Sequence, residues 1–231
     1  KYIKIQNFYK KEDMIMIKNI INKLKCEKYY KHSNNYIFNN KRKQYILYQN
    51  NIFVEEKGKE ELLKSHFKTM KNRLFEPLKI SYLKRFCDEM EKTNNFCLER
   101  IAYIEVSPGC VEQPPHTDPL PIKEDHNMYY ITVALEDATK EMGGTIVYNY
   151  EEIKNVDDLK QIDSKLLYSK KKLLVLNSGD INIHNNLTVH HGAANNSNKI
   201  RKFLFIVFSI KNNKYKNEIL ITNNFINNEI I

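Results

Sequence analysis

The most informative stretch of the sequence is Pro-Pro-His-Thr-Asp-Pro at residues 114–119. Successive side chains of a β-strand point to opposite faces, so in a strand His116 and Asp118 would point to the same side. One imidazole nitrogen and one carboxylate oxygen could then reach a single metal ion. A His-x-Asp triplet also arises by chance or as a polar turn after two prolines, so the interpretation needs support from elsewhere in the chain.

That support comes about 70 residues later, where residues 179–201 read GDINIHNNLTVHHGAANNSNKIR. A histidine from this distant segment would complete a site of two histidines and one carboxylate, which leaves three coordination positions of Fe(II) open. Arg201 begins the next strand-like pattern, and a guanidinium there could bind a carboxylate through two parallel hydrogen bonds. It is the only arginine between Arg100 and the C-terminus of a lysine-rich chain, which favours a geometric need for it.

Short alternating segments surround the two motifs and predict a sandwich or barrel of β-strands. In contrast, residues 1–95 show helical patterns, with apolar residues three and four apart, and a tyrosine-rich stretch typical of one or two strands. We therefore expect a single domain over residues 1–231. Its parts would be a largely helical N-terminal part (1–95), a β core (96–212) and a C-terminal extension (213–231). The strand candidates are 98–106, 129–135, 145–150, 172–176, 181–184, 187–190 and 200–210; the helix candidates are 12–24, 59–75 and 80–90, and the tyrosine-rich stretch is 36–54.

The net charge of +9 is compatible with an acidic partner, but the basic residues are spread along the chain. The short basic runs 41–43 and 170–172 are therefore interpreted as solvated surface. The four cysteines, at 26, 87, 97 and 110, lack metal-ligand spacing, so we expect free thiols in a reducing compartment. No segment has the roughly 18 uncharged apolar residues of a membrane span. The chain begins at Lys1, so an upstream targeting segment can be missing from it.

The ordered set of residues around both motifs is more specific than either motif alone. Asp180 follows a glycine and precedes His190 by ten residues. The set resembles the Fe(II)/2-oxoglutarate oxygenase superfamily, most closely its phytanoyl-CoA hydroxylase-like branch, over roughly residues 98–210. The other matching positions are Pro108-Gly109, Gln113, His116-Thr117-Asp118, 133–137, 142–145, Gly192, Asn195, Ser197 and Arg201.

This resemblance implies a mainly β fold, a double-stranded β-helix of the jelly-roll or cupin-like type, flanked by helices. It implies Fe(II) bound by His116, Asp118 and His190, with the adjacent His191 as the alternative distal ligand. The cofactors would be Fe(II), 2-oxoglutarate as cosubstrate and O₂, with ascorbate as an optional reductant. Because only neutral imidazoles bind metal, the affinity is expected to fall below a pH of about 6.5.

The resemblance also assigns the far carboxylate of 2-oxoglutarate to Arg201. Thr132 and Tyr130 would line the same pocket if they share the inward face of their strand, although core packing explains them equally well. Tyr103 could donate its hydroxyl to the cosubstrate, or simply pack. Ser197 could bond near the cosubstrate or stabilise the turn. His184 is expected to pack or hydrogen-bond rather than bind metal, and no catalytic residue is expected beyond the metal ligands.

The function implied is hydroxylation of an unidentified small-molecule or protein substrate, with conversion of 2-oxoglutarate to succinate and CO₂. A prolyl-type protein hydroxylase, a nucleic-acid demethylase and a non-catalytic metal-binding barrel remain as alternatives. A nucleic-acid substrate is not favoured, because demethylases usually carry a second arginine and none follows Arg201. The sequons at Asn186 and Asn195 lie inside the motif, where a glycan would obstruct the site, so an intracellular, cytoplasmic location is expected. The oligomeric state stays open.

Overall fold

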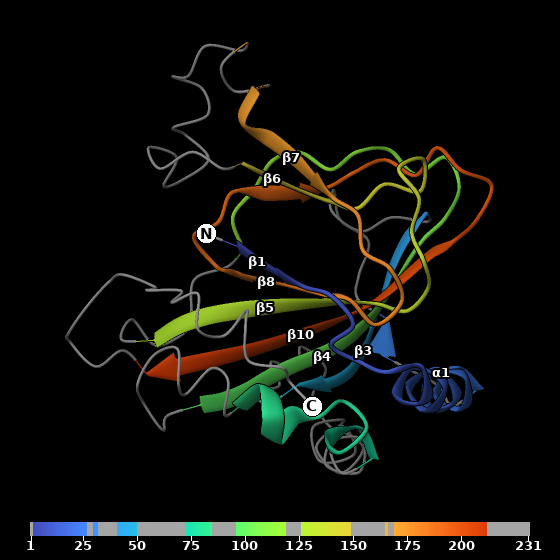
Figure 1. Ribbon diagram of the computed structural model, residues 1–231, viewed down its shortest axis with the longest axis vertical. Coiled ribbons are helices and arrows are strands. Elements are labelled where there is room, and N and C mark those ends of the chain that lie inside the picture. The colour runs from blue at the N-terminus through green and yellow to red at the C-terminus, as the bar shows by residue number, and fades with distance from the viewer. Residues whose placement is uncertain are drawn as a thin grey trace, which may run out of the picture.

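The structure is a computed structural model that describes residues 2–26, 30–31, 41–49, 73–84, 96–118, 126–148, 165 and 169–211. Antiparallel strands form a seven-stranded sheet in the order β1-β8-β5-β10-β4-β3-β2 and a three-stranded sheet in the order β7-β6-β9. The small sheet lies on one side of the large sheet and helix α1 on the other (Figure 1). The elements are β1 (Tyr2–Ile5), α1 (Lys11–Cys26), β2 (Tyr30–Lys31), β3 (Arg42–Gln49), β4 (Phe96–Val106), β5 (His126–Ala134), β6 (Thr145–Tyr148), β7 (Lys171–Leu174), β8 (Ile181–Asn185), β9 (His190–Gly192) and β10 (Arg201–Lys211).

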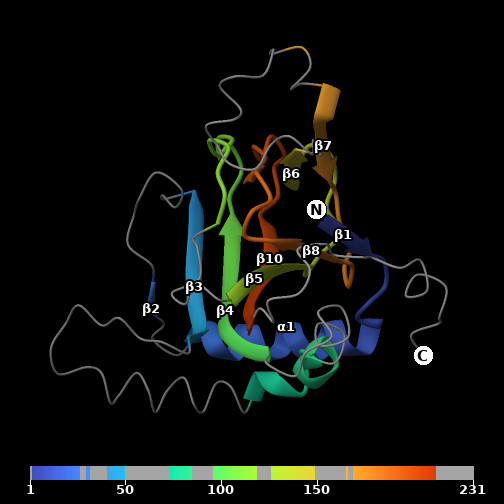
Figure 2. The same ribbon diagram turned by 90° about the vertical axis from the view of Figure 1, so that its left-hand side faces the viewer.

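The two faces of the large sheet differ in character, because side chains alternate along each strand. One face carries Ile131, Ile183 and Ile206, all buried in one apolar core that also includes residues of α1. Figure 2 shows α1 running beneath the sheet on this side. The other face carries polar residues, among them Arg201 and His184, and it points toward the small sheet. The sheet therefore separates the packed core from the candidate site.

Helix α1 forms where the sequence predicts a helix over residues 12–24. Glu12 and Asp13 occupy its first turn, where carboxylates favour the helix dipole, and Asp13 Oδ2 accepts a hydrogen bond from Lys10 N at 2.8 Å. Met14, Ile17 and Ile21 share one face and are buried against the sheet. Burying each such side chain contributes roughly 1.5–3 kcal/mol, which docks the helix.

The expectation of a largely helical N-terminal part is not confirmed. Among the described residues before Phe96, three strands join the large sheet: β1 pairs with β8, β2 with β3, and β3 with β4. Strand β3 lies inside the stretch 36–54, as predicted. Residues 73–75 and 80–84 are helical with a turn at Pro77 between them. The remainder of the helices predicted over 59–75 and 80–90 lies outside the described residues.

The later strands follow the predicted alternation closely, with one error. Strands β4, β5, β6, β7, β8 and β10 overlap six of the seven predicted segments. The seventh, 187–190, is mostly a turn, and β9 begins only at His190. The short run Leu-Thr-Val misled the prediction because β8 ends at Asn185 and residues 186–189 form the turn that leads into β9. Residues 213–231, the predicted C-terminal extension, lie outside the described part.

Two further expectations concern the whole chain. The structure describes the side chains of Cys97 and Cys110, and both are free thiols. Within the described ranges, no helix combines the length and the apolar character that crossing a membrane requires.

Candidate metal centre

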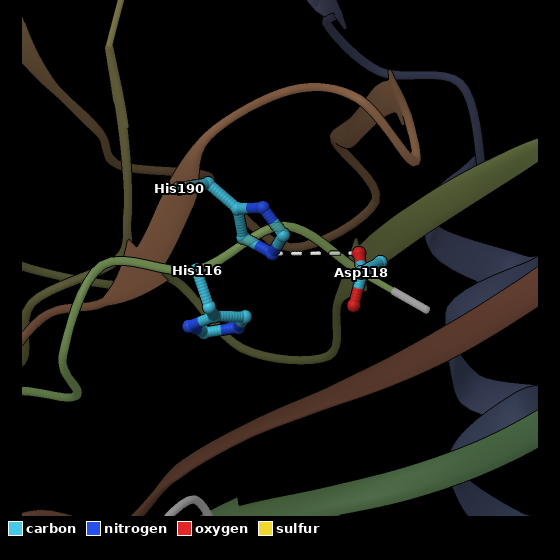
Figure 3. A group of neighbouring side chains, drawn as sticks. All are labelled: His116, Asp118 and His190. Atoms are coloured by element: carbon cyan, nitrogen blue, oxygen red, sulfur yellow. Dashed lines mark ion pairs between the residues drawn. The ribbon is translucent and has the colours of Figure 1, made fainter. Parts of the chain in front are cut away.

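Three side chains from distant parts of the sequence meet on the inner side of the barrel. His116 and His190 face each other across an antiparallel bridge, in which each backbone N–H donates to the other residue's carbonyl at 2.9 Å. Asp118 lies two residues beyond His116, and its Oδ2 is 3.5 Å from His190 Nε2 (Figure 3). The potential ligand atoms of His116, Asp118 and His190 all lie within 4.8 Å of one another. The structure thus brings together the three residues that the sequence proposes as metal ligands.

Both imidazoles are held in the orientation that a metal site needs. His116 Nδ1 lies 2.8 Å from the Pro114 carbonyl oxygen, and His190 Nδ1 lies 2.9 Å from the Thr188 carbonyl oxygen. A carbonyl oxygen only accepts hydrogen bonds, so Nδ1 carries the proton in each ring. The Nε2 lone pairs are then left for a cation, and the backbone fixes the tautomer as it does in known metal-binding histidines.

The charges of the cluster also suit a cation. Burial lowers the pKa of His190 to about 4, aided by His184, and burial and the neighbouring His190 lower the pKa of His116. Burial alone would raise the pKa of Asp118, but the hydrogen bond from His184 and the nearby imidazoles outweigh it and lower that pKa. Two neutral imidazoles and one carboxylate are the ligand states that bind a divalent cation. The residues present therefore fit Fe(II), for which two histidines and one carboxylate are a known ligand set.

His191 points away from this cluster. Its Nε2 is 2.8 Å from Glu112 Oε1, and Glu112 also forms an ion pair with Lys171 at 3.0 Å. Adjacent residues of strand β9 face opposite sides, so only one of the two histidines can join His116 and Asp118. The structure places His190 in that position, in agreement with the sequence register.

A third imidazole, His184, lies beside the cluster. It is 2% exposed, its ring centroid is 4.4 Å from that of His190, and its Nε2 is 3.3 Å from Asp118 Oδ2. The sequence predicted that His184 packs or hydrogen-bonds, but not that it contacts the candidate ligands. The alternation of side chains along β8 places His184 on the same face as Asn182, and this was visible in the sequence. No sequence feature, however, placed β8 next to Asp118.

Arg201 begins β10 and lies buried on the inner face. Its Nη1 donates to the Met142 carbonyl at 2.7 Å and its Nη2 to the Ala193 carbonyl at 3.3 Å. Burial, together with the nearby charge of Arg42, lowers the pKa of Arg201 to about 10, so the guanidinium stays charged at neutral pH.

Arg42 is a second buried guanidinium that the sequence did not predict. Strand register pairs Val106 with Arg201 on one side and with Arg42 on the other, so all three side chains share the inner face. Arg42 Nη2 donates to the same Ala193 carbonyl at 3.3 Å, and the residue is only 4% exposed. The interpretation of residues 41–43 as solvated surface is therefore wrong for Arg42, because its strand lies inside the sheet.

A glycine makes room for the Arg201 side chain. Gly143 has φ +73°, a conformation that other L-residues rarely adopt. A Cβ at this position would lie 2.6 Å from Arg201 Nη1 and against the Ala194 carbonyl. The Gly143-Gly144 pair that contributes to the family resemblance thus has a physical role beside Arg201.

The remaining candidates divide between the two faces of the sheet. Thr132 and Tyr130 share the inner face, where register places them opposite Asn182 and His184. Tyr103 lies on the other face: it is three positions from Val106, its hydroxyl donates to Glu105 Oε1 at 2.7 Å, and it belongs to the apolar core. The expectation that Tyr103 reaches the cosubstrate is therefore wrong, because the strand turns it toward the helices.

Of the two roles predicted for Ser197, its hydrogen bonds agree with stabilisation of the turn. Its hydroxyl donates to Asn195 Oδ1 at 2.7 Å and accepts from Lys199 N at 3.1 Å. Asn195 is itself buried, and its amide donates to the Val106 and Lys199 carbonyls at 2.8 Å each. Together these bonds stabilise the turn that leads into Arg201.

Two facing antiparallel sheets around such a cluster are the architecture of double-stranded β-helix oxygenases, which depend on iron and 2-oxoglutarate. The chain belongs to the phytanoyl-CoA dioxygenase (PhyH) family, whose model matches residues 2–203. Membership gives iron and 2-oxoglutarate as its cofactors. No curated protein matches the sequence.

Several solved structures share the fold. The 2-oxoglutarate-dependent carbocyclase SnoK from nogalamycin biosynthesis is 14% identical, with 90% of this chain and 79% of that chain covered and a TM-score of 0.65. The epimerase SnoN, in complex with Fe³⁺, 2-oxoglutarate and nogalamycin RO, is 14% identical, with coverages of 93% and 82% and a TM-score of 0.60. HygX from Streptomyces hygroscopicus, with nickel, 2-oxoglutarate and hygromycin B bound, is 9% identical, with coverages of 90% and 82% and a TM-score of 0.53. At these identities the likeness concerns the fold.

Proposed function

We propose that the chain is an Fe(II)- and 2-oxoglutarate-dependent dioxygenase in which His116, Asp118 and His190 hold the iron. The observation that carries the proposal is the convergence of their ligand atoms within 4.8 Å, with both imidazoles hydrogen-bonded through Nδ1. Three protein ligands leave room for a bidentate cosubstrate and for O₂. When bound, the iron supplies the oxidation chemistry, in which 2-oxoglutarate becomes succinate and CO₂.

Arg201 is proposed to bind the far carboxylate of 2-oxoglutarate, with Arg42 beside it. Both guanidiniums are buried, lie on the inner face and meet at the Ala193 carbonyl. A buried guanidinium forms strong charge-assisted hydrogen bonds with a carboxylate, because the low dielectric of the interior does not screen them. Thr132 and Tyr130, on the same face, would line the pocket and exclude water from it.

The substrate is proposed to be a small molecule, and hydroxylation is the reaction we favour. SnoN and HygX, which share the fold, bind the small molecules nogalamycin RO and hygromycin B. SnoK and SnoN are a carbocyclase and an epimerase, so carbocyclisation and epimerisation are the alternative outcomes on the same fold. The prolyl-type alternative loses its support from Tyr103, which faces the apolar core.

Residues 1–231 are proposed to form one oxygenase domain, because β1 at the N-terminus pairs with β8 in the core sheet. An intracellular, cytoplasmic location is also proposed. Asn195 is fully buried and Asn186 is 5% exposed, so a glycan attached to either sequon would prevent this packing. A protein that folds in the cytoplasm does not meet the glycosylation machinery, so both asparagines can be buried without a glycan.

The experiment that tests the proposed function measures succinate formed from 2-oxoglutarate in the presence of Fe(II), O₂ and pools of small molecules. Succinate formation above the level of the Asp118→Ala variant, with a substrate mass increased by one oxygen, is the expected result. A product of unchanged oxygen content would indicate carbocyclisation or epimerisation instead. If 2-oxoglutarate binds but no pool yields succinate, the result would favour a non-catalytic metal-binding barrel over an enzyme.

A further inference from the structure

His184 is placed by β8 on the inner wall of the barrel, against the candidate metal ligands. Its ring stacks on Tyr130, with centroids 5.6 Å apart and planes 14° apart, because the two residues are direct partners in the β5–β8 register. The side chain is essentially buried. An imidazole with these neighbours has little freedom to rotate, so its two nitrogens have defined partners.

Each nitrogen of His184 faces a different polar group. Nδ1 is 3.4 Å from the Asn182 side-chain nitrogen, and Nε2 is 3.3 Å from Asp118 Oδ2. In this orientation the Asn182 amide donates to Nδ1, so Nδ1 is the acceptor and Nε2 carries the proton. Nε2–H then donates to the Asp118 carboxylate. The reverse tautomer would place a lone pair against the carboxylate oxygen, which is unfavourable.

We propose that His184 is a positioning residue that orients the Asp118 carboxylate for metal binding, with Asn182 selecting its tautomer. This inference rests on the proposed function of His116, Asp118 and His190 as iron ligands. Asp118 needs such support because residue 118 lies outside any strand. Of the other described side chains, His190 lies 3.5 Å from its carboxylate, while Arg100 and His116 act on it through their charge. Outer partners of metal ligands typically change metal affinity by 10–100-fold.

A role as a fourth metal ligand is the competing explanation for His184. Four protein ligands would leave two of six positions open, and a bidentate 2-oxoglutarate would use both, with none left for O₂. In the described part of the chain, the set of ligand atoms within 4.8 Å of one another contains His116, Asp118 and His190 but not His184. Positioning therefore agrees better with both the chemistry and the geometry.

The test uses two variants of His184 in the full chain. His184→Phe keeps a flat ring against Tyr130 but removes the donor, whereas His184→Gln keeps an N–H donor of similar reach. Ile183→Val, on the opposite face of β8, is the matched control for packing. Mn(II) affinity is measured by calorimetry, and Co(II)-loaded protein is compared by its visible absorption spectrum, which reports the ligand number.

We expect His184→Phe to weaken Mn(II) binding by about 10-fold or more, His184→Gln to recover most of the loss, and Ile183→Val to have no effect. The Co(II) spectra of all variants should keep the wild-type shape. Unfolding curves of the metal-free variants show whether each one folds. If His184→Phe does not fold, Asn182→Leu, which leaves His184 in place, should still weaken binding several-fold.

Three results would overturn the proposal. Equal Mn(II) affinity of wild type and His184→Phe would show that the contact with Asp118 is structural only. Loss of affinity in both variants, with a Co(II) spectrum of lower ligand number, would make His184 a ligand. Failure of the wild type itself to bind Mn(II) would remove the proposed iron site together with this inference, which distinguishes it from the first two results.

Discussion

At the scale of single residues, the site depends on how backbone carbonyls and neighbouring side chains prepare each group. Carbonyls hold Nδ1 of His116 and of His190, and burial keeps the rings neutral. Arg201 remains charged although buried, since its guanidinium donates to two carbonyls. The same principle explains both: a buried polar group needs defined partners, and those partners fix its orientation.

Replacing Arg201 with alanine should weaken 2-oxoglutarate binding. Truncating one partner of a buried, hydrogen-bonded charge pair costs about 2 kcal/mol or more, which corresponds to about a 30-fold increase in Kd. Calorimetry on the Mn(II)-loaded protein measures this value. Lys202→Ala is the matched control, because Lys202 forms only a partly exposed ion pair with Glu136 at 3.0 Å. Equal Kd values for the two variants would contradict the assignment of Arg201.

The stability of the metal-free protein should fall as the pH drops from about 6.5 toward 4. Burial lowers the pKa of both His190 and His191 to about 4 from the usual 6.5. Between these values the unfolded chain binds more protons than the folded chain, so each histidine lowers the free energy of unfolding by up to about 1.4 kcal/mol per pH unit. Urea unfolding at pH 6.5, 5.5 and 5.0 tests this, and a midpoint independent of pH would contradict it.

The same low pKa of His190 predicts a weaker pH dependence of metal binding than a free imidazole would give. A free imidazole would begin to lose metal near pH 6.5, as the sequence alone suggests. In the folded site His190 stays neutral well below that pH. Mn(II) affinity measured at pH 7.0 and 6.0 should therefore differ little, and a tenfold loss over that unit would show that the imidazoles titrate near their usual pKa.

At the scale of elements, long alternating segments were predictable and short or distant ones were not. Strands β4 and β10 have eleven residues each, and their period-two pattern is visible in the sequence. Strand β1 has four residues and gains its structure by pairing with β8, which is remote in sequence. A pattern cannot report a partner that lies far along the chain. The ligand triad and Arg201 lie in recognisable motifs and were predicted, whereas Arg42 reaches the site only through the pairing of β3 with β4.

The turn between Lys140 and Gly144 should tolerate substitution at one position and not at another. Gly143→Ala would place a Cβ against the Ala194 carbonyl and Arg201 Nη1, in a conformation that costs an L-residue about 1–2 kcal/mol. We expect a lower melting temperature and weaker 2-oxoglutarate binding. Lys140→Ala, at an exposed position of the same turn, should change neither. Normal binding by Gly143→Ala would show that Arg201 does not depend on this space.

At the scale of the whole molecule, the large sheet separates stability from function. Ile206 is fully buried on the helix side, and Phe205 next to it faces the barrel. Ile206→Ala should lower the free energy of unfolding by about 2–5 kcal/mol, as deletions of buried aliphatic groups do. Its Mn(II) affinity, measured where the variant is folded, should equal that of the wild type. A large loss of affinity without loss of stability would contradict this separation.

We propose that His116, Asp118 and His190 form an iron site that recruits 2-oxoglutarate. Calorimetric titration of 2-oxoglutarate into Mn(II)-loaded and metal-free protein, for the wild type and for Asp118→Ala, tests it most directly. We expect tight binding that requires the metal and disappears in Asp118→Ala, with both proteins folded. Absence of binding to the metal-loaded wild type, or equal binding to Asp118→Ala, would contradict it.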